Sequence, residues 1–160
     1  MLTLVTSPHQ WEEALPLLMD AMGRWSAVSE WGRRYLTDPE DTLWVWETPR
    51  GPVGVIGFHR QPGRSAEITH IAIHSPWRGR GLGRQLIQAA WSRHPDVEQL
   101  VLETDDDAIA FYRRLGWDCQ AIGPKKPGWR TRYRCTCSRN DASGSIVDVG
   151  SHFMRKDDGA

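Results

Sequence analysis

The sequence predicts an α/β (α+β) domain in which a central sheet of about seven strands is flanked by four helices. Three observations support this prediction: short segments rich in β-branched and aromatic residues, longer segments with an apolar residue at every third or fourth position, and glycines or prolines between them. The strand-like segments are residues 2–6, 42–47, 53–59, 66–74, 97–103, 117–122 and 129–137. The helical segments are residues 8–22, 25–36, 82–93 and 108–115.

Capping and breaking residues define the N-terminal elements. Ser7 followed by Pro8 predicts the N-cap and first turn of a helix that follows the opening strand. The apolar stripe of this helix continues to Met22, and we expect Pro16 to bend or split it. Gly23 breaks the pattern before the second, shorter helix.

A β-hairpin and a strand–turn–helix unit form the middle of the chain. The strands 42–47 and 53–59 are joined by Thr48-Pro49-Arg50-Gly51-Pro52, a sequence typical of a turn. A third strand, residues 66–74, leads through a glycine-rich turn into the amphipathic helix 82–93. This order predicts a helix that starts directly beside the end of a strand.

The last helix, residues 108–115, has apolar residues at positions i, i+3, i+4 and i+7. An aspartate before it is expected to be the N-cap, and Gly116 has the position of the C′ residue. Two closing strands follow. Residues 138–160 have few large apolar side chains and no clear period, so we expect a disordered tail after a domain of residues 1–137.

The charge of the 160-residue chain is balanced, with 20 basic and 20 acidic residues. A general attraction to nucleic acid or to an anionic membrane is therefore not expected. No apolar stretch has the length of a membrane span or the features of a signal peptide, which favours a cytoplasmic protein. Cys119, Cys135 and Cys137 have neither an even count nor a zinc-ligand spacing, so we expect reduced thiols and no metal.

The most informative stretch is Ser75-Pro76-Trp77-Arg78-Gly79-Arg80-Gly81-Leu82-Gly83-Arg84, which joins an apolar strand to a helix. Its alternate glycines allow positive φ angles and a close approach of the backbone to a ligand, although a plain connecting turn would also use them. Amides at a helix N-terminus bind anions, and three arginines add positive charge. We therefore expect this turn to bind a phosphate group.

Two common phosphate motifs do not fit this turn. A P-loop needs Lys and then Ser or Thr after its last glycine, and neither follows here. A dinucleotide-binding turn needs a third glycine at the position where Arg84 stands. The ligand is therefore expected to be a different phosphate compound.

Arg78-Gly79-Arg80-Gly81-Leu82-Gly83 resembles the acetyl-CoA pyrophosphate loop of the GNAT superfamily of N-acetyltransferases, written Arg/Gln-x-x-Gly-x-Gly/Ala. A second segment, residues 105–117, resembles the superfamily's Asn-x-x-Ala-x-x-Phe-Tyr-x-x-x-Gly-Phe motif. Asp105 stands where Asn is usual and Trp117 where Phe is usual, and both keep the character of the usual residue. The resemblance extends over residues 2–137.

This resemblance implies a GNAT fold, with a mixed, mostly antiparallel sheet and a splayed strand pair at the cofactor site. It implies that acetyl-CoA is the co-substrate and that a primary amine attacks the thioester directly in a ternary complex. The residues it implies in acetyl-CoA binding are Ile71, Ala72, Ile73, Arg78, Gly79, Arg80, Gly81, Leu82, Gly83 and Arg84. It also implies that Tyr112 is the general acid for the departing thiolate, with a core tyrosine as the alternative.

Glu67 is the first candidate for the general base, because several superfamily members place their base at this strand position. A solvated strand carboxylate is the alternative interpretation. His70 is the second candidate, since imidazole titrates near neutral pH. Strict alternation along the strand would put Glu67 and His70 on opposite faces, so we expect only one of them to reach the cleft. Ordered water in place of a side-chain base stays open.

The acceptor is expected to be a small-molecule amine, but its identity does not follow from the sequence. Four acids that would favour a cationic amine, or alternatively cap a helix, are Glu103, Asp105, Asp106 and Asp107. The resemblance implies that the two N-terminal helices form the acceptor wall. The residues expected there are Trp25, Glu30, Trp31 and Tyr35.

Two other classes of protein stay open beside an enzyme. A non-catalytic acetyl-CoA sensor would share the fold and the glycine-rich turn, although an intact Tyr112 argues against it. Basic and aromatic residues alternate over 125–134, as in some nucleic-acid-binding modules, but alternate arginines on a strand also make an ordinary exposed face. With no net charge, we expect neither a nucleic-acid nor a membrane partner, and a homodimer is compatible with the sequence.

Overall fold

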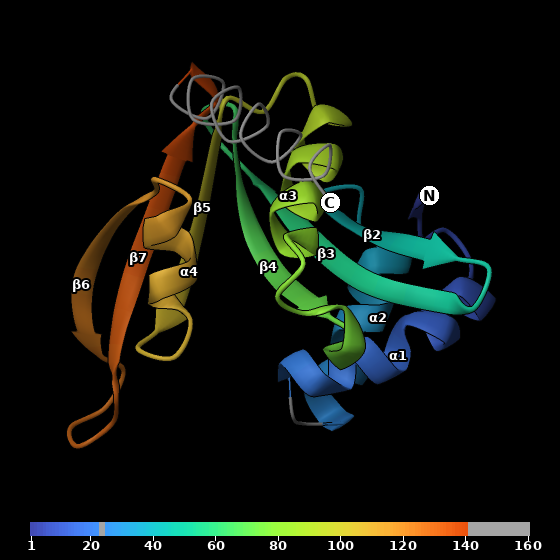
Figure 1. Ribbon diagram of the computed structural model, residues 1–160, viewed down its shortest axis with the longest axis horizontal. Helices are drawn as coiled ribbons and strands as arrows, with labels where there is room; N and C mark the ends of the chain where they lie inside the picture. The colour runs from blue at the N-terminus through green and yellow to red at the C-terminus, as the bar shows by residue number, and fades with distance from the viewer. Residues whose placement is uncertain (23–24, 141–160) are drawn as a thin grey trace, which may run out of the picture. The chain divides into compact units, whose positions relative to one another are not determined.

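The computed structural model describes residues 1–22 and 25–140 and divides into two compact units, Met1–Asp96 and Val97–Ala160 (Figure 1). The elements, in chain order, are β1 (Leu2–Leu4), α1 (Pro8–Met22), α2 (Trp25–Thr37), β2 (Asp41–Thr48), β3 (Gly51–Gln61), β4 (Ser65–Ile73), a 3-10 turn (Ser75–Trp77), α3 (Leu82–Ser92), β5 (Gln99–Asp105), α4 (Ile109–Arg114), β6 (Asp118–Pro124) and β7 (Thr131–Ser138). Each predicted strand and helix is confirmed to within two residues at either end. The predicted break at Gly23 and most of the predicted tail lie outside the described residues.

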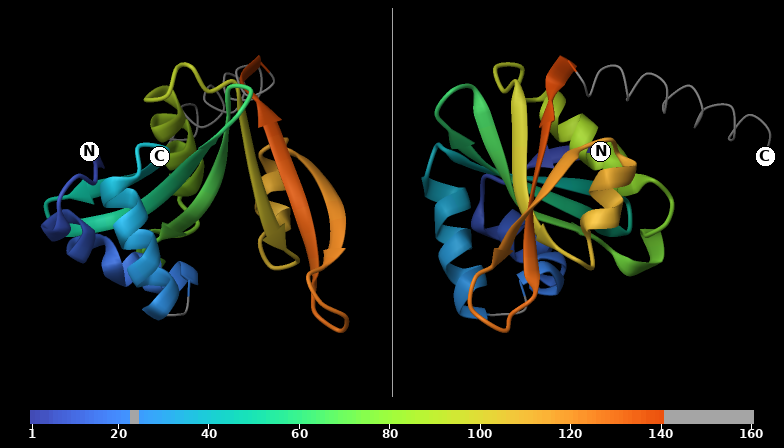
Figure 2. Two further views of the ribbon diagram at one scale, coloured as in Figure 1. Left: turned by 180° about the vertical axis from the view of Figure 1, so that it is seen from behind. Right: turned by 90° about the vertical axis from the view of Figure 1, so that its left-hand side faces the viewer.

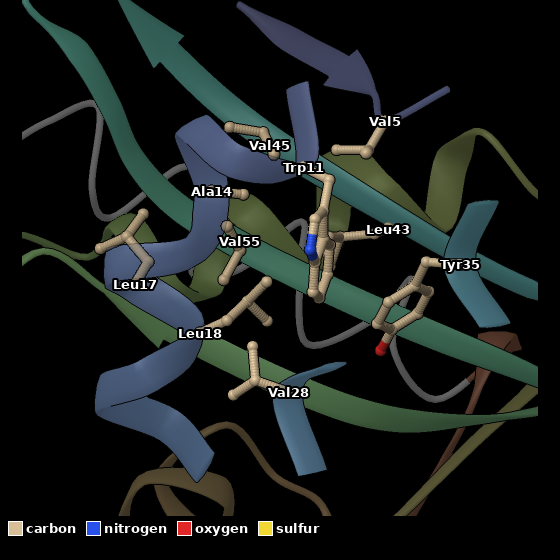
Figure 3. Packing of buried hydrophobic residues seen from close by; sticks show 10 residues of the cluster. All are labelled: Val5, Trp11, Ala14, Leu17, Leu18, Val28, Tyr35, Leu43, Val45 and Val55. Carbon is tan, nitrogen blue, oxygen red and sulfur yellow. The ribbon is translucent and has the colours of Figure 1, made fainter. Parts of the chain in front are cut away.

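The first unit is an antiparallel sheet in the order β1-β2-β3-β4 with helices on both faces. Helices α1 and α2 cover one face, where Leu43, Val45 and Val55 pack with buried residues of both helices (Figure 3). Helix α3 covers the other face, since a Cβ on Gly54 would lie 3.2 Å from Leu86. Figure 1 shows α3 in front of this sheet, and the view from behind in Figure 2 brings α2 to the front.

Helix α1 begins with a capping box, as the sequence predicted for its N-cap. The backbone N–H of Gln10 donates to Ser7 Oγ at 3.2 Å, and the backbone N–H of Ser7 donates to Gln10 Oε1 at 3.2 Å. Pro8 occupies the first helical position. The helix then continues through Pro16 to Met22, so Pro16 does not split it, and the alternative expectation of a bend stays a prediction.

The ladder between β3 and β4 contains a β-bulge. Gly57 pairs with His70, and the next residue, Phe58, pairs with Ile68, so Thr69 is an extra residue on β4. The bulge shifts the alternation, so His70, opposite Gly57, and Glu67, opposite His59, both lie on the face covered by α1 and α2. The prediction that Glu67 and His70 lie on opposite faces is therefore wrong.

The second unit is an antiparallel sheet in the order β5-β7-β6, packed against α4. Gly116 has φ +84° and is confirmed as the C′ residue, since its N–H donates to Arg113 O and the Trp117 N–H donates to Tyr112 O. The expected aspartate N-cap is wrong: Ala108 is the N-cap, and Asp105 Oδ1 accepts the Asp107 N–H in the preceding turn instead. The three cysteines are free thiols, as predicted.

Candidate active site

The glycine-rich turn between β4 and α3 has the geometry of an anion site. Gly79 and Gly81 both have φ +76°, a conformation that favours glycine. Gly81 is the N-cap of α3, and because it has no side chain, the first amides of the helix are not capped by it. At Gly79, no atom of the described residues other than Gly79 and its two chain neighbours lies within 4 Å of the place a Cβ would take. The turn therefore offers backbone N–H groups and room for a ligand.

The three arginines of this turn differ in their contacts. The Arg78 Nε–H donates to Ile73 O at 2.9 Å, which ties the turn to the end of β4. The Arg80 guanidinium lies over the Trp77 ring at 5.5 Å. Arg84 Nε is buried and, like Arg132 Nε on β7, has no hydrogen-bond partner in the part of the chain that the structure describes. A buried, unpaired guanidinium nitrogen at a helix N-terminus fits a phosphate ligand.

The backbone of β4 distinguishes the three residues expected to bind a pantetheine arm. The His74 N–H donates to Val53 O at 2.8 Å, so this pair is a hydrogen-bonded one. Such pairs alternate in an antiparallel ladder, and Ala72 therefore directs its N–H and C=O toward β3. The same groups of Ile71 and Ile73 point to the other edge of β4. These two residues, and not Ala72, can offer backbone hydrogen bonds to an extended ligand there.

A half-buried chain of polar groups links α2 to the bulge in β4. Tyr35 Oη lies 2.5 Å from Thr69 Oγ1 and 2.7 Å from His70 Nδ1. The Trp31 and His70 rings meet edge to face with centroids 4.7 Å apart. Two of the residues expected in the acceptor wall, Trp31 and Tyr35, therefore contact a candidate base directly.

Gly57 makes room for this chain of groups. A Cβ at Gly57 would overlap the Tyr35 hydroxyl and would lie 2.7 Å from Thr69 Oγ1. Burial, assisted by the positive charge of Arg34, lowers the pKa of the His70 imidazole from 6.5 to about 4. Burial also raises the pKa of the Tyr35 phenol. Near neutral pH the imidazole and the phenol are therefore both uncharged.

A second polar group of residues lies on the same face. The buried Asp41 carboxylate accepts hydrogen bonds from Arg34 Nε at 3.1 Å and from His59 Nδ1 at 2.8 Å. Glu67, opposite His59 in the ladder, is half-buried, and its Oε2 accepts a hydrogen bond from Gln61 Nε2 at 3.3 Å. Both candidate bases, Glu67 and His70, therefore lie beneath α2. The Asp41 carboxylate on the same face is already engaged by Arg34 and His59.

Tyr112 lies on α4 in the second unit and is buried. Its ring contacts Trp117 with centroids 5.4 Å apart and Phe111 at 5.0 Å. Burial raises the pKa of its phenol, and the nearby Cys135 and Cys119 add to this effect. The side chain is therefore packed as a core residue and keeps its proton, which a general acid requires.

The acidic residues expected to attract a cationic amine have partners within the second unit. Asp107 Oδ2 accepts a hydrogen bond from Arg130 at 2.6 Å, and Asp106 Oδ1 accepts one from the Tyr133 hydroxyl at 2.6 Å. In the β5–β7 ladder, acids and arginines stand opposite each other: Glu103 faces Arg134 and Asp105 faces Arg132. These pairs weaken both the amine-pocket interpretation of the acids and the nucleic-acid interpretation of the arginines.

Several residues of the buried polar groups were missed from the sequence. They are Arg34, Asp41, Gly57, His59 and Thr69. One signal was present: Ile68 and Ile71 are three residues apart with the polar pair Thr69-His70 between them, a spacing that breaks strand alternation. Of the other expected wall residues, Glu30 is exposed, and the side chain of Trp25 lies outside the described ones.

The described residues contain neither a cluster of metal ligands nor a helix suited to span a membrane. Within residues 1–22 and 25–140, no group of three or more His, Cys, Asp or Glu side chains is arranged to hold a metal ion. None of the helices in this part of the chain combines the length and the apolar composition that a membrane span requires.

Comparison with known proteins gives one family. The sequence model of the acetyltransferase (GNAT) family matches residues 7–117. An uncharacterized ycf52-like N-acetyltransferase of Prochlorococcus marinus is 34% identical over 91 residues, which are 53% of this chain and 50% of that protein. Serotonin N-acetyltransferase of Mesocricetus auratus is 30% identical over 86 residues, 50% of this chain and 39% of that protein. The chain thus spans half or less of the length of these two relatives.

Solved structures extend the likeness over most of the chain. The crystal structure of an aminoglycoside 6'-N-acetyltransferase complexed with coenzyme A superposes with a TM-score of 0.72 at 17% identity. The superposition covers 86% of this chain and 96% of that one. At this identity the likeness shows the fold alone, and it confirms the fold predicted from the two motifs.

Proposed function

Since the chain belongs to the acetyltransferase (GNAT) family, we propose that it transfers the acetyl group of acetyl-CoA to the primary amine of a small molecule that is cationic in neutral solution. The observation that carries this proposal is the turn before α3, where positive-φ glycines, uncapped helix amides and the unpaired Arg84 Nε converge among the described residues. A pyrophosphate would satisfy all three features.

Acetyl-CoA is the co-substrate in this proposal, because its pyrophosphate suits the glycine-rich turn and its pantetheine arm suits the edge of β4. The amides of Gly79 to Arg84 hold the pyrophosphate, with Arg84 supplying a charged hydrogen bond. The backbone groups of Ile71 and Ile73 bind the pantetheine arm along the edge of β4 that faces away from β3. Arg78 fixes the end of β4 against the turn and so sets the distance between the pantetheine site and the pyrophosphate site.

The proton balance of the reaction requires groups that accept and donate protons. A primary ammonium has a pKa of about 10.4 and must lose a proton before its nitrogen can attack the thioester carbonyl. Glu67 is the general base for this step, and its position on the face beneath α2 supports the assignment. One further proton leaves the nitrogen when the amide forms, and the departing thiolate gains one.

Tyr112 is the general acid that serves the departing sulfur. Because a thiol has a pKa of about 8.5, complete transfer from a phenol whose pKa is raised by burial is uphill. A hydrogen bond from Tyr112 to the developing thiolate therefore carries much of the effect. Removing this hydroxyl should lower kcat by about 10²-fold.

The test is a panel of small primary amines assayed by release of the CoA thiol. We expect at least one amine to give steady turnover, with Tyr112→Phe reducing kcat as stated. Tyr133→Phe, which removes an exposed tyrosine hydroxyl from the same unit, is the matched control and should keep wild-type kcat. Binding of acetyl-CoA without turnover of any amine would identify a sensor, and full activity of Tyr112→Phe would show that water protonates the thiolate.

The role of Glu67 needs its own variant. Glu67→Gln should lower kcat/KM across the pH range, because the amide cannot accept the ammonium proton. Glu40→Gln changes an exposed turn carboxylate of the same unit and should have no effect. Unchanged kcat/KM in Glu67→Gln at every pH would remove Glu67 from the mechanism.

A further inference from the structure

Two of the three cysteines stand directly opposite each other in the ladder between β6 and β7. Cys119 of β6 pairs with Cys135 of β7, whereas Cys137, two residues further along β7, pairs with Leu100 of β5. Side chains at opposite positions of an antiparallel ladder lie on the same face, with Cβ atoms about 4.5–5.5 Å apart. The fold therefore brings together two free thiols that are distant in the sequence.

This pair lies on the face of the sheet that α4 covers. Tyr133 is two residues from Cys135 on β7 and therefore shares its face. The Arg113 guanidinium of α4 lies over the Tyr133 ring at 5.6 Å. Both thiols are also near enough to the Tyr112 phenol to contribute to its raised pKa. The two sulfur atoms therefore lie beneath the helix that carries Tyr112.

The two thiols differ in their access to solvent. Cys135 is 0% exposed, whereas Cys119 is half-buried on the outer strand. Burial raises the pKa of the Cys135 thiol to about 12, and the nearby Cys119 adds to this effect. The thiolate is the form of cysteine that reacts with oxidants, so a buried thiol that keeps its proton is a poor first target. Cys119 is the thiol that an oxidant from solvent meets first.

A bond between these two sulfur atoms needs a small movement of one edge strand. The Cβ atoms of a disulfide lie about 3.5–4.5 Å apart, so opposite residues must approach by about 1 Å. Strand β6 is the last strand in the sheet order, and Figure 1 shows it at the outer edge of its unit. The ladder between β6 and β7 also has an irregular register between Ala121 and Gly123. An edge strand with such an irregularity can make this movement.

The third cysteine does not compete for this bond in the folded protein. Cys137 and Cys135 are two residues apart on one strand, which places their Cβ atoms about 6.6 Å apart and pointing in parallel directions. That separation exceeds the reach of a disulfide. The ladder therefore selects one of the possible pairings.

We propose that Cys119 and Cys135 form a peroxide-sensitive pair, in which hydrogen peroxide oxidises Cys119 and Cys135 captures the product as a reversible disulfide. A sulfenic acid beside a second thiol condenses to a disulfide, whereas an isolated one is oxidised further to the irreversible sulfinic acid. Cys135 thus protects Cys119 from permanent oxidation. This modification site goes beyond the proposed function and does not depend on it.

The two steps consume one hydrogen peroxide and release two waters. The Cys119 thiolate attacks one peroxide oxygen, the S–O bond forms as the O–O bond breaks, and the departing hydroxide takes up the proton that the thiol lost. The Cys135 sulfur then attacks the Cys119 sulfur. The S–S bond forms as the S–O bond breaks, and the second hydroxide leaves with the Cys135 proton as water. Both sulfur atoms are oxidised and both peroxide oxygens are reduced.

The first experiment maps the disulfide in the full chain. The folded protein is treated with one equivalent of hydrogen peroxide, digested without reduction and examined by mass spectrometry. We expect linked peptides of Cys119 and Cys135, which dithiothreitol separates. Protein oxidised in urea should also contain a Cys119–Cys137 link, because no ladder selects the partner there. Absence of the Cys119–Cys135 link in the folded protein, or the same mixture in both samples, would overturn the proposal.

The second experiment separates the roles of the two thiols. In Cys135→Ala, we expect peroxide to convert Cys119 to the sulfinic acid, which dithiothreitol does not reverse. Cys137→Ala removes the other buried cysteine of β7 and is the matched control, which should keep the Cys119–Cys135 link. Cys119→Ser changes the half-buried position and should leave Cys135 as a thiol. Oxidation of Cys135 in Cys119→Ser at the wild-type rate would contradict the order of the two steps.

Discussion

The turn before α3 carries three arginines and the turn before α4 carries three aspartates. The two turns differ in whether their polar side-chain atoms have hydrogen-bond partners. In the first, Arg84 Nε is buried without a partner among the described residues, and the helix that follows has a glycine as its N-cap. In the second, Asp105, Asp106 and Asp107 each accept a hydrogen bond from within their own unit. The first turn has polar groups to offer a ligand, whereas the three acids of the second are engaged. The other buried unpartnered nitrogen among the described residues, Arg132 Nε, lies on β7 and outside both turns.

This difference is the basis for proposing a ligand site at the first turn and a structural role for the second. Burying a polar group without a partner costs free energy, and a bound ligand that accepts its hydrogen bond offsets this cost. An exposed acid with a nearby arginine is common on protein surfaces and contributes little to stability. The charge runs alone did not distinguish the two cases, whereas the partners of the individual atoms do.

The largest expected effect comes from the half-buried His70 imidazole beneath α2, because burial disfavours its charged form. Its folded pKa of about 4 lies below the ordinary value of 6.5, so as pH falls the unfolded chain binds the proton first. The stabilising effect is complete above pH 6.5 and is lost as pH falls toward 4, by roughly 3 kcal/mol at most. Urea unfolding of the wild-type protein and of His70→Gln from pH 7 to pH 4.5 measures it.

The comparison with His70→Gln isolates this residue from the other groups that titrate. We expect the wild-type protein to lose more stability than the variant over this interval. Equal pH slopes for the two proteins would mean that the imidazole is not buried in its neutral form.

The next largest effect is expected at Arg84, whose Nε has no hydrogen-bond partner among the described residues. Arg84→Met removes the charged donor and keeps most of the side-chain volume, so we expect the Kd for acetyl-CoA to rise by about 10- to 100-fold. Arg93→Met changes an exposed arginine at the other end of α3 and should leave the Kd unchanged. Isothermal titration of both variants makes the comparison, and equal Kd values would remove Arg84 from the site.

A smaller effect concerns the space above Gly79. Gly79 and Gly63 have φ angles of +76° and +79°, and at neither position does a described atom beyond the chain neighbours lie within 4 Å of a new Cβ. Replacement by Ala should therefore cost both variants about 1 kcal/mol of backbone strain. Only Gly79→Ala should also raise the Kd for acetyl-CoA, by about 10-fold, because its methyl group occupies the ligand's space. Equal binding by the two variants would contradict a close approach at Gly79.

The smallest effect is expected in the acidic turn. Asp107→Asn keeps the shape of a side chain that pairs with Arg130 at the surface, so stability should change by less than about 1 kcal/mol. The KM for the amine should stay within about 2-fold of the wild-type value. A 10-fold rise in that KM would show that the acids bind the amine, and the contrast between the two turns would fail.

The parts of the molecule that local signals encode were predictable from the sequence. Ser7 with Pro8 marked the start of α1, Gly116 marked the end of α4, and the alternate glycines marked the turn before α3. These signals work because capping groups and positive φ angles depend on one or two neighbouring residues. Proline was less decisive, since packing of its buried face keeps α1 continuous through Pro16.

The arrangement beneath α2 depends on contacts between distant residues and was not predictable in the same way. Tyr35 meets His70 across 35 positions of the chain. A one-residue bulge reverses the face of every residue beyond it, so strict alternation put Glu67 and His70 on opposite faces. The partners of the acids of the second unit were not predictable for a similar reason, because Arg130 and Tyr133 lie more than 20 positions away.

The most direct test of the central claim is a titration that removes the pyrophosphate from the ligand. Binding of acetyl-CoA and of S-acetylpantetheine is measured by calorimetry with the wild-type protein and with Arg84→Met. We predict that the wild-type protein binds acetyl-CoA at least about 10²-fold more tightly, and that Arg84→Met narrows this ratio by about 10-fold or more. Equal affinity of the wild-type protein for the two ligands would contradict a pyrophosphate site at the glycine-rich turn.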